Sequence, residues 1–343
     1  MCWPAARGRR RGPYQATTAV LPPILQILAD GGPQTGFGHL GRCLAIAEEL
    51  GDGATYFTVA DEAAAEFVRR HGGRVGGEPA AVVLIDRRAP TDAVEVAALH
   101  ADGCRVVLLD DAGSGRDTAD LVIDPPTAVA WPPTRTPRLG GFEHVLLRRA
   151  VRAAAATASP DQAVLLTLGG SDPTGATPAL ADALTDAGID VRVAIGPGYR
   201  GERPRSGTIV DTPEQFIAAL AASQLLVSSY GHTLLEAAHL GIPAIVVAAL
   251  PEHRDDAAAF CANGTAVLCE MSAGPPELVA LVRELLADGD RRAALAARGR
   301  ELVDGRGAER VAAATRELAA PAGHAGPVVA RNVGWDAIDC AAC

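Results

Sequence analysis

Hydrophobic residues form a repeating pattern along the chain from about residue 24 onward. Short runs of aliphatic and β-branched residues alternate with longer, alanine-rich segments that have the length of helices. This alternation is typical of parallel strands joined by crossover helices, and it predicts an α/β protein. In the first half, we expect strands at 24–28, 55–59, 81–85, 105–109 and 121–123, with helices at 40–50, 62–71 and 93–101.

Irregular segments divide this pattern into two similar halves. Prolines at positions 125, 126, 132, 133 and 137 exclude a central strand and favour an extended connection, and a second break covers 153–160. Beyond this break, we expect strands at 163–168, 191–195, 208–210, 225–228, 244–247 and 266–268. The helices are expected at 178–187, 213–221, 233–240, 255–263, 275–287, 290–303 and 308–318.

Two α/β units of similar size predict two Rossmann-like, doubly wound domains that face each other across a cleft. We place the first domain at residues 21–152 and the second at residues 160–305. A helix within 306–319 is expected to cross back onto the first domain, with a flexible extension at 1–20 and a tail at 320–343. Sheets of this kind bind ligands beyond the carboxyl ends of their strands, so the cleft is the expected site.

Charge and composition exclude several functions. The chain of 343 residues has a net charge of −10, so it does not present the clustered basic surface that binds nucleic acid. All 31 basic residues are arginine, and the absence of lysine excludes both a Walker A phosphate loop and a lysine Schiff base.

The cysteines and the apolar segments bear on location. Seven scattered cysteines do not make a disulfide framework in a chain of this size, so a cytoplasmic location is expected. No stretch approaches the roughly 20 apolar residues of a membrane span. The pair Cys340 and Cys343 is only half of a structural zinc site; metal binding and partner docking are the alternatives for this pair.

The first candidate site is the glycine-rich turn between the first expected strand and the next helix. Gly36 and Gly38 let the backbone approach a ligand, and the helix start presents free N–H groups to an anion such as a diphosphate. His39 begins this helix, and the ordinary histidine pKa of about 6.5 suits a proton acceptor at neutral pH. A tight turn with a capping or buried histidine explains the same residues. The third glycine of the dinucleotide fingerprint is missing, which disfavours NAD.

The second candidate site follows the first expected strand of the second half. Gly169 and Gly170 can admit a phosphate at the edge of the cleft, with Ser171 beside them. The alternative interpretation is an ordinary turn between strand and helix, in which Ser171 or the next residue caps the helix.

The third candidate site combines a strand end, a glycine turn and the start of a helix. Backbone and hydroxyl donors at Gly231, His232 and Thr233 can hold a phosphate, and Glu236 can accept hydrogen bonds from ribose hydroxyls. A carboxylate in this position also stabilises the helix dipole without any ligand. Three such loops on two domains favour a ligand site over three unrelated turns.

In this order, the loops resemble the UDP-sugar hydrolases of pseudaminic acid biosynthesis and their relatives, which share the MurG-like GT-B glycosyltransferase fold. The resemblance spans about residues 24–318. The matching segments are Asp30 with 36–44, then 109–111, 147–148, 169–173 and 231–236.

This resemblance implies a GT-B fold with the sugar in the first domain and UDP in the second. It implies that His39 is the base that activates water against the anomeric carbon, with inversion and release of UDP. It places Glu236 on the ribose and the helix at Thr233 near the diphosphate. No metal or cofactor is expected, because the nucleotide-sugar is the substrate and UDP the product.

Two departures from the family leave the identity of the sugar open. Arg87 and Arg88 follow Asp86 where relatives usually have an aromatic residue, and His253 and Arg254 stand where relatives have an Asn-Gln pair. His253 and Arg254 together can put extra positive charge near the expected diphosphate, although a solvated helix start explains them at least as well.

Hydrolysis and glycosyl transfer share the donor site and differ in the group that attacks C1. The resemblance favours the hydrolase. The alternative is a GT-B glycosyltransferase of specialised metabolism that passes the sugar to a small-molecule or peptide acceptor. An epimerase on the same fold and a non-catalytic nucleotide-sugar-binding or accessory protein are further alternatives.

Overall fold

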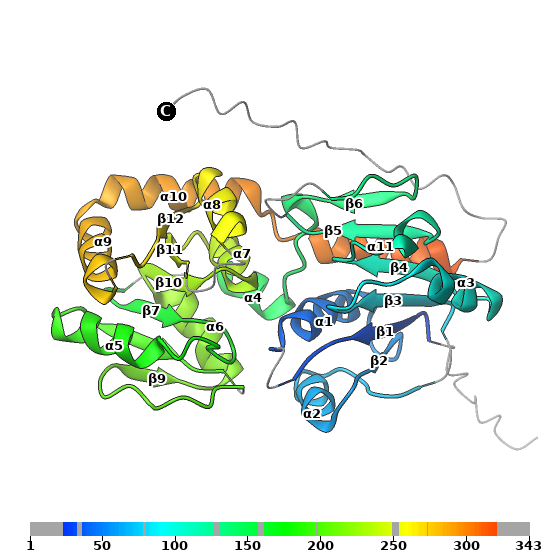
Figure 1. Cartoon of the computed structure of the whole chain (residues 1–343), viewed down its shortest axis with the longest axis horizontal. Coiled ribbons are helices and arrows are strands. Elements are labelled where there is room, and N and C mark those ends of the chain that lie inside the picture. Colours follow the sequence, from blue (N-terminus) through cyan, green and yellow to red (C-terminus); the bar gives the residue numbers. More distant parts are fainter. Residues whose placement is uncertain are drawn as a thin grey trace, which may run out of the picture.

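The computed structural model describes residues 23–32, 36–77, 80–126, 131–156, 161–196, 198–248, 254–272 and 274–320. These residues form two domains side by side, each built around a parallel sheet of six strands with helices on both faces (Figure 1). This confirms the expected α/β class with two doubly wound domains. The expected extension, the tail with Cys340 and Cys343, and His253 lie outside the described residues. None of the helices within these ranges is long and apolar enough to cross a membrane.

The first domain is built on a sheet with the strand order β2-β1-β3-β4-β5-β6. All five residues of β3 are buried, as expected for a strand that helices cover on both faces. The strands are β1 (Leu25–Ala29), β2 (Thr55–Thr58), β3 (Val82–Asp86), β4 (Arg105–Leu109), β5 (Leu121–Asp124) and β6 (Arg138–Gly140). The helices are α1 (Gly38–Leu50), α2 (Glu62–Arg70) and α3 (Ala93–Ala101), with short 3₁₀ helices η1 (Ser114–Asp117) and η2 (Phe142–His144).

The second domain is built on a sheet with the order β12-β11-β10-β7-β8-β9. Its strands are β7 (Val164–Thr167), β8 (Val191–Ala194), β9 (Thr208–Val210), β10 (Leu225–Ser229), β11 (Ala244–Val247) and β12 (Ala266–Cys269). Its helices are α4 (Arg149–Ala155), α5 (Thr177–Asp186), α6 (Pro213–Ala222), α7 (His232–Leu240), α8 (Arg254–Ala262), α9 (Pro275–Ala287) and α10 (Gly289–Leu302).

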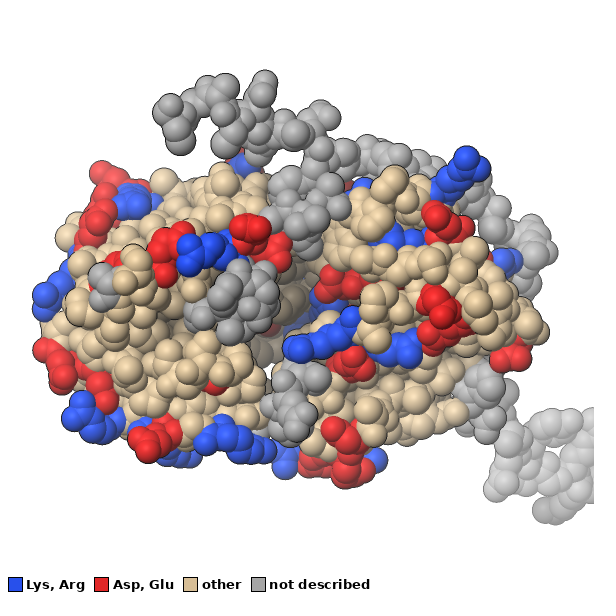
Figure 2. Space-filling view, viewed as in Figure 1, with Lys and Arg blue, Asp and Glu red and all other residues tan. Residues whose placement is uncertain are grey.

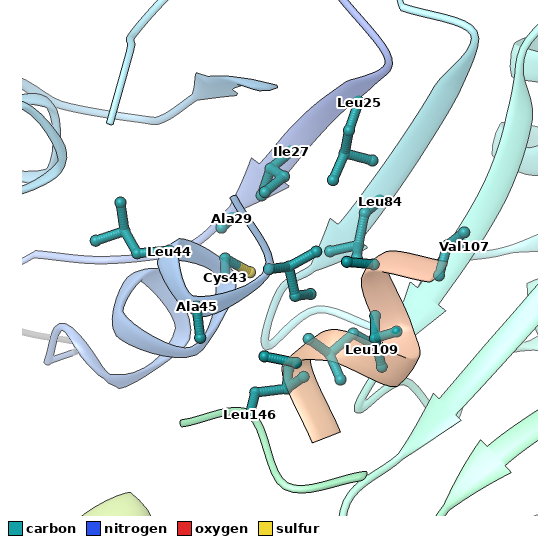
Figure 3. Close-up of a cluster of buried hydrophobic side chains, with 14 of the residues drawn as sticks. Leu25, Ile27, Ala29, Cys43, Leu44, Ala45, Leu84, Val107, Leu109 and Leu146 are labelled. Atoms are coloured by element: carbon teal, nitrogen blue, oxygen red, sulfur yellow. The ribbon is translucent and has the colours of Figure 1, made fainter. Parts of the chain in front are cut away.

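The last helix, α11 (Gly307–Ala319), connects the second domain back to the first. It follows α10 along the chain but packs beside α1, and its Val311 and Ala312 are fully buried in the first hydrophobic core. Figure 3 shows α1 and α11 against the sheet, with Cys43 among the buried aliphatic side chains. The first domain therefore includes a helix from the far end of the chain.

Two elements correct the expected pattern. The proline-rich segment, expected to be irregular, contains the edge strand β6, which pairs with β5 beyond Pro137, so no proline ring removes a ladder hydrogen bond within the strand. Helix α4 covers part of the expected second break, and its Val151 is buried in the core of the second domain. Arg148 and Arg152 pair with Glu48 and Glu49 of α1, so this segment ties the domains together.

Candidate active site

The predicted site residues lie where each sheet reverses its strand order. In the first sheet, β2 and β3 flank β1 on opposite sides, so the loops after β1 and β3 diverge. In the second sheet, β7 and β10 are neighbours, and the strands that follow each of them lie on opposite sides. Such points form crevices at the carboxyl ends of the strands in open α/β sheets. His39 follows β1, Gly169 follows β7 and Gly231 follows β10.

A cavity of about 260 Å³ lies between the domains at this level. Gly38 and His39 line it from the first domain, and Gly231 and His232 line it from the second. Figure 2 shows basic and acidic side chains together along the boundary between the domains on the face in view. The structure thus brings together candidate residues from two loops that are far apart in the sequence.

The other candidate residues lie outside the described lining of this cavity, and their role in nucleotide binding stays a prediction. They are Gly36, Gly169, Gly170, Ser171, Thr233 and Glu236. Gly36 and Gly169 adopt φ angles of 78° and 86°, which favour glycine. A Cβ on Gly196 would lie 2.4 Å from the Cα of Gly170, so these two loops pack backbone against backbone.

His39 and Arg42, which both line the cavity, belong to a hydrogen-bonded group centred on Asp86. His39 Nδ1 lies 2.6 Å from Asp86 Oδ1, and Arg42 donates from Nε to Oδ2 at 2.8 Å and from Nη2 to Oδ1 at 2.6 Å. Cys43 donates its thiol to Oδ2 at 3.2 Å. Asp86 itself is fully buried. A carboxylate with this many donors is held in one orientation.

The charge on Asp86 fixes the tautomer of the neutral His39 ring. Burial opposes ionisation, but the charge and hydrogen bonds of Arg42, followed by His39, hold the pKa of Asp86 well below its ordinary value. An ionised carboxylate only accepts hydrogen bonds, so Nδ1 of His39 carries the hydrogen. Arg42 Nη2, 3.0 Å from the same Nδ1, is also a donor, so both groups converge on Asp86 rather than bond each other. Nε2 of neutral His39 is therefore free to accept a proton.

Asp110 completes the group on the first-domain side. It follows β4, lines the cavity and lies 2.7 Å from Arg42 Nη2. Its φ of 58° is in the left-handed region that few residues other than glycine adopt. The charge of Arg42 is thus balanced by two carboxylates.

Asp86, Arg42 and Asp110 are not among the candidate site residues predicted from the sequence. Asp86 ends a run of apolar residues at the carboxyl end of a strand, and Arg42 comes one helical turn after His39. Asp86 is therefore marked in the sequence as a polar residue at a strand end, and Arg42 as a polar residue on the same helix face as His39.

The electrostatics of the second-domain side are set by burial. Burial, aided by the charge of Arg42, lowers the pKa of His232 to about 4, so this ring is neutral at pH 7. Its buried Nε2 has no hydrogen-bond partner among the described residues. Burial raises the pKa of Glu236 to about 7, against the opposing charge of Arg148.

One hydrogen bond crosses between the domains beside the cavity. The Tyr230 hydroxyl, in the loop before α7, donates to the carbonyl oxygen of Pro126 at 3.3 Å. His144, on the segment that connects the domains, also lines the cavity. The site is therefore composed of both domains and their connection.

Two facing parallel sheets with a cavity at their switch points are the architecture of the two-domain GT-B fold. No protein-family model matches the sequence, and no curated protein matches it. The fold is similar to that of MurG from Acinetobacter baumannii, with a TM-score of 0.58 and 15% identity over 86% of this chain and 100% of that one.

Two further structures have the same fold. The glycotransferase of kitacinnamycin gives a TM-score of 0.57 and 14% identity over 87% of this chain and 99% of that one. The spinosyn rhamnosyltransferase SpnG, complexed with thymidine diphosphate, gives 0.59 and 15% over 84% and 99%. At these identities, the likeness defines the GT-B fold of the chain.

Proposed function

We propose that the protein is an inverting glycosyltransferase that uses a nucleotide-sugar, with His39 as the general base. The observation that carries this proposal is the His39–Asp86 pair, 2.6 Å apart, in which His39 lines a cavity between two GT-B domains. A histidine with one nitrogen held by a buried carboxylate is oriented to accept a proton at the other. The glycosyltransferases of similar fold support transfer over hydrolysis.

The proposed reaction is a single displacement at the anomeric carbon. An acceptor hydroxyl attacks C1 from the face opposite the nucleotide, and its proton moves to Nε2 of His39. The new bond joins the acceptor oxygen to C1, while the bond from C1 to the phosphate oxygen breaks and its electron pair leaves with the nucleoside diphosphate. Asp86 stabilises the imidazolium that forms and acts as a positioning residue.

The proposed nucleotide site is the second domain. Helix α7 begins after Gly231 with no side-chain cap and no acidic residue in its first turn, and the N–H of Leu234 donates to the carbonyl of Gly231. The N–H groups of His232 and Thr233 are therefore the ones available to a diphosphate. In this proposal Thr233 adds a hydroxyl donor, and Glu236 binds the ribose hydroxyls. Gly169, Gly170 and Ser171 would border the same nucleotide from the loop after β7.

Hydrolysis of the nucleotide-sugar is the second candidate. The sequence from Gly36 to Leu44 resembles that of the UDP-sugar hydrolases, and the same base can activate water in place of an acceptor hydroxyl. The two candidates therefore differ in the nucleophile and share His39.

The test measures nucleotide release from a panel of UDP- and thymidine-diphosphate sugars, with and without a panel of hydroxylated acceptors. Release that depends on an acceptor supports transfer, and release in water alone supports hydrolysis. Binding without release under either condition would overturn both in favour of a binding protein. Failure of both nucleotides to bind would overturn the nucleotide site itself.

His39 is tested with one variant and a matched control at another histidine. In His39→Asn the amide occupies the place of Nδ1 and keeps a donor for Asp86, but nothing replaces Nε2. We expect its turnover to fall by about 10²–10⁴-fold, the usual contribution of a general base. His100→Asn, a change at a surface histidine paired with Asp120, is the matched control. Equal turnover in His39→Asn and His100→Asn would remove His39 from the mechanism.

A further inference from the structure

Three side chains on the first-domain side of the cavity present hydrogen-bond acceptors to it. They are His39, Asp110 and His144, which we call the acceptor wall. In His39 the hydrogen is on Nδ1, because that atom faces the carboxylate of Asp86, so Nε2 is the acceptor.

His144 is fixed in the same tautomer by a different partner. Its Nδ1 lies 2.7 Å from the carbonyl oxygen of Gly140, which can only accept a hydrogen bond, so Nδ1 is the donor and Nε2 the acceptor. The side chain is only 9% exposed, and Nε2 has no hydrogen bond to any residue that the structure describes. An acceptor on a cavity wall with no protein donor can accept a hydrogen bond from a ligand or from water.

Asp110 adds a negative charge to this wall. Its side chain is 29% exposed, and Oδ2 pairs with Arg42, so the carboxylate has capacity to accept a further hydrogen bond from a ligand. Arg42 also neutralises Asp86, so one guanidinium serves two carboxylates. The wall therefore offers acceptors and an excess of negative charge to whatever binds beside His39.

We infer that the acceptor wall selects nucleotide-sugars whose sugar presents hydroxyl or amino groups and rejects those whose sugar presents a carboxylate. This inference rests on the proposed function and names the substrate class of the same site. Hydroxyl and amino groups donate into Asp110 and His144. A carboxylate brings only lone pairs and a second negative charge, and close like charges out of bulk water repel strongly.

The matched probes are UDP-glucose and UDP-glucuronate, which differ only in a hydroxymethyl group and a carboxylate at C6. Binding of each to the full chain is measured by calorimetry, with UDP as the reference. We expect UDP-glucuronate to bind at least about tenfold more weakly than UDP-glucose, as two facing carboxylates at short range imply. Equal or tighter binding of UDP-glucuronate would overturn the inference.

Asp110→Asn removes the charge and keeps the shape, and asparagine tolerates the positive φ at this position. We expect the preference for UDP-glucose to fall to within about threefold or to reverse. In this variant Arg42 pairs with one charged carboxylate, that of Asp86, instead of two. The control is Asp102→Asn, an exposed residue that precedes the opposite end of the same strand, β4, and its preference should match that of the parent protein. If Asp110→Asn matches Asp102→Asn, Asp110 has no part in selection.

His144 is tested with a pair of amides. His144→Asn keeps a donor for Gly140 but has no atom at Nε2, whereas His144→Gln can place an oxygen near that position. Weaker UDP-glucose binding in His144→Asn than in His144→Gln supports recognition, and the reverse order indicates a structural role that overturns this part. Binding of UDP alone, measured for every variant, distinguishes a failure of the proposed function from a failure of this inference. If neither UDP nor thymidine diphosphate binds, the proposed function fails, and if UDP binds without discrimination between the sugars, only this inference fails.

Discussion

Nδ1 of His39 lies 2.6 Å from Oδ1 of Asp86, although 47 residues separate the two in the sequence. The contact follows from strand order, because β1 and β3 are neighbours and Ala29, at the end of β1, pairs with Asp86 in register. The loop after β1 then returns into α1, whose first turn carries His39. The topology of the sheet therefore creates the pair that orients the proposed base.

Asp86→Asn should lower turnover by about 10²–10⁴-fold and leave nucleotide affinity nearly unchanged. An asparagine amide can donate to Nδ1 of His39, which favours the tautomer with the hydrogen on Nε2 and removes the base. Steady-state kinetics of nucleotide release and calorimetry with the nucleotide measure the two effects. The exposed Asp102→Asn variant is the control, and a fully active Asp86→Asn would show that His39 does not depend on this carboxylate.

Arg42→Met should destabilise the fold by about 3–5 kcal/mol, because it leaves the fully buried Asp86 without its main compensating charge. Urea unfolding at neutral pH measures the change. Arg105→Met removes an arginine from the exposed pair with Asp120 and should cost about 1 kcal/mol or less. The double variant Arg42→Met with Asp86→Asn should recover part of the loss, and strict additivity would contradict the argument.

Much of the fold is predictable because its signals are local. Buried parallel strands appear in the sequence as continuous apolar runs, and β3 and β4 each have a polar residue at one end only. The short edge strand β6 and helix α4 have no such signal. β6 buries none of its three residues fully, and α4 is an arginine- and alanine-rich segment that only Val151 anchors in the core.

The candidate site is predictable only where a local motif marks it. His39 and His232 follow glycines at the starts of helices, and both line the cavity. Asp86 stands in an apolar run without a glycine, and its partnership with His39 depends on β1 lying beside β3, which the alternation of strands and helices does not reveal. His144 lies on the connection between the domains, where the sequence has no periodic pattern at all.

His232 should make the folded protein less stable in mild acid. Burial lowers its pKa in the fold to about 4, whereas in the unfolded chain it is about 6.5, so between these values only the unfolded state takes up the proton. The free energy of unfolding should therefore fall as the pH drops from about 6.5 to about 4, and His232→Asn should remove about 1–2 kcal/mol of that decline. Urea unfolding at pH 7.5 and pH 4.5 measures it, with the exposed His100→Asn as control. An unchanged decline in His232→Asn would exclude this residue as the cause.

Gly307→Ala should destabilise the contact between the last helix and the connection between the domains. A methyl group at this first residue of α11 would lie 2.3 Å from the carbonyl oxygen of Val145 and 2.5 Å from the carbonyl carbon of His144, and both are backbone atoms that cannot rotate away. Overpacking of this kind typically costs about 1–3 kcal/mol, here measured as a lower urea midpoint.

Gly289→Ala is the matched control, because it also replaces the first residue of a helix, α10, where the nearest atom is a flexible arginine nitrogen at 3.9 Å. Since alanine favours helix more than glycine does, Gly289→Ala should be neutral or slightly stabilising. Equal midpoints for the two variants would mean that the contact between α11 and the residues next to the cavity contributes nothing to stability.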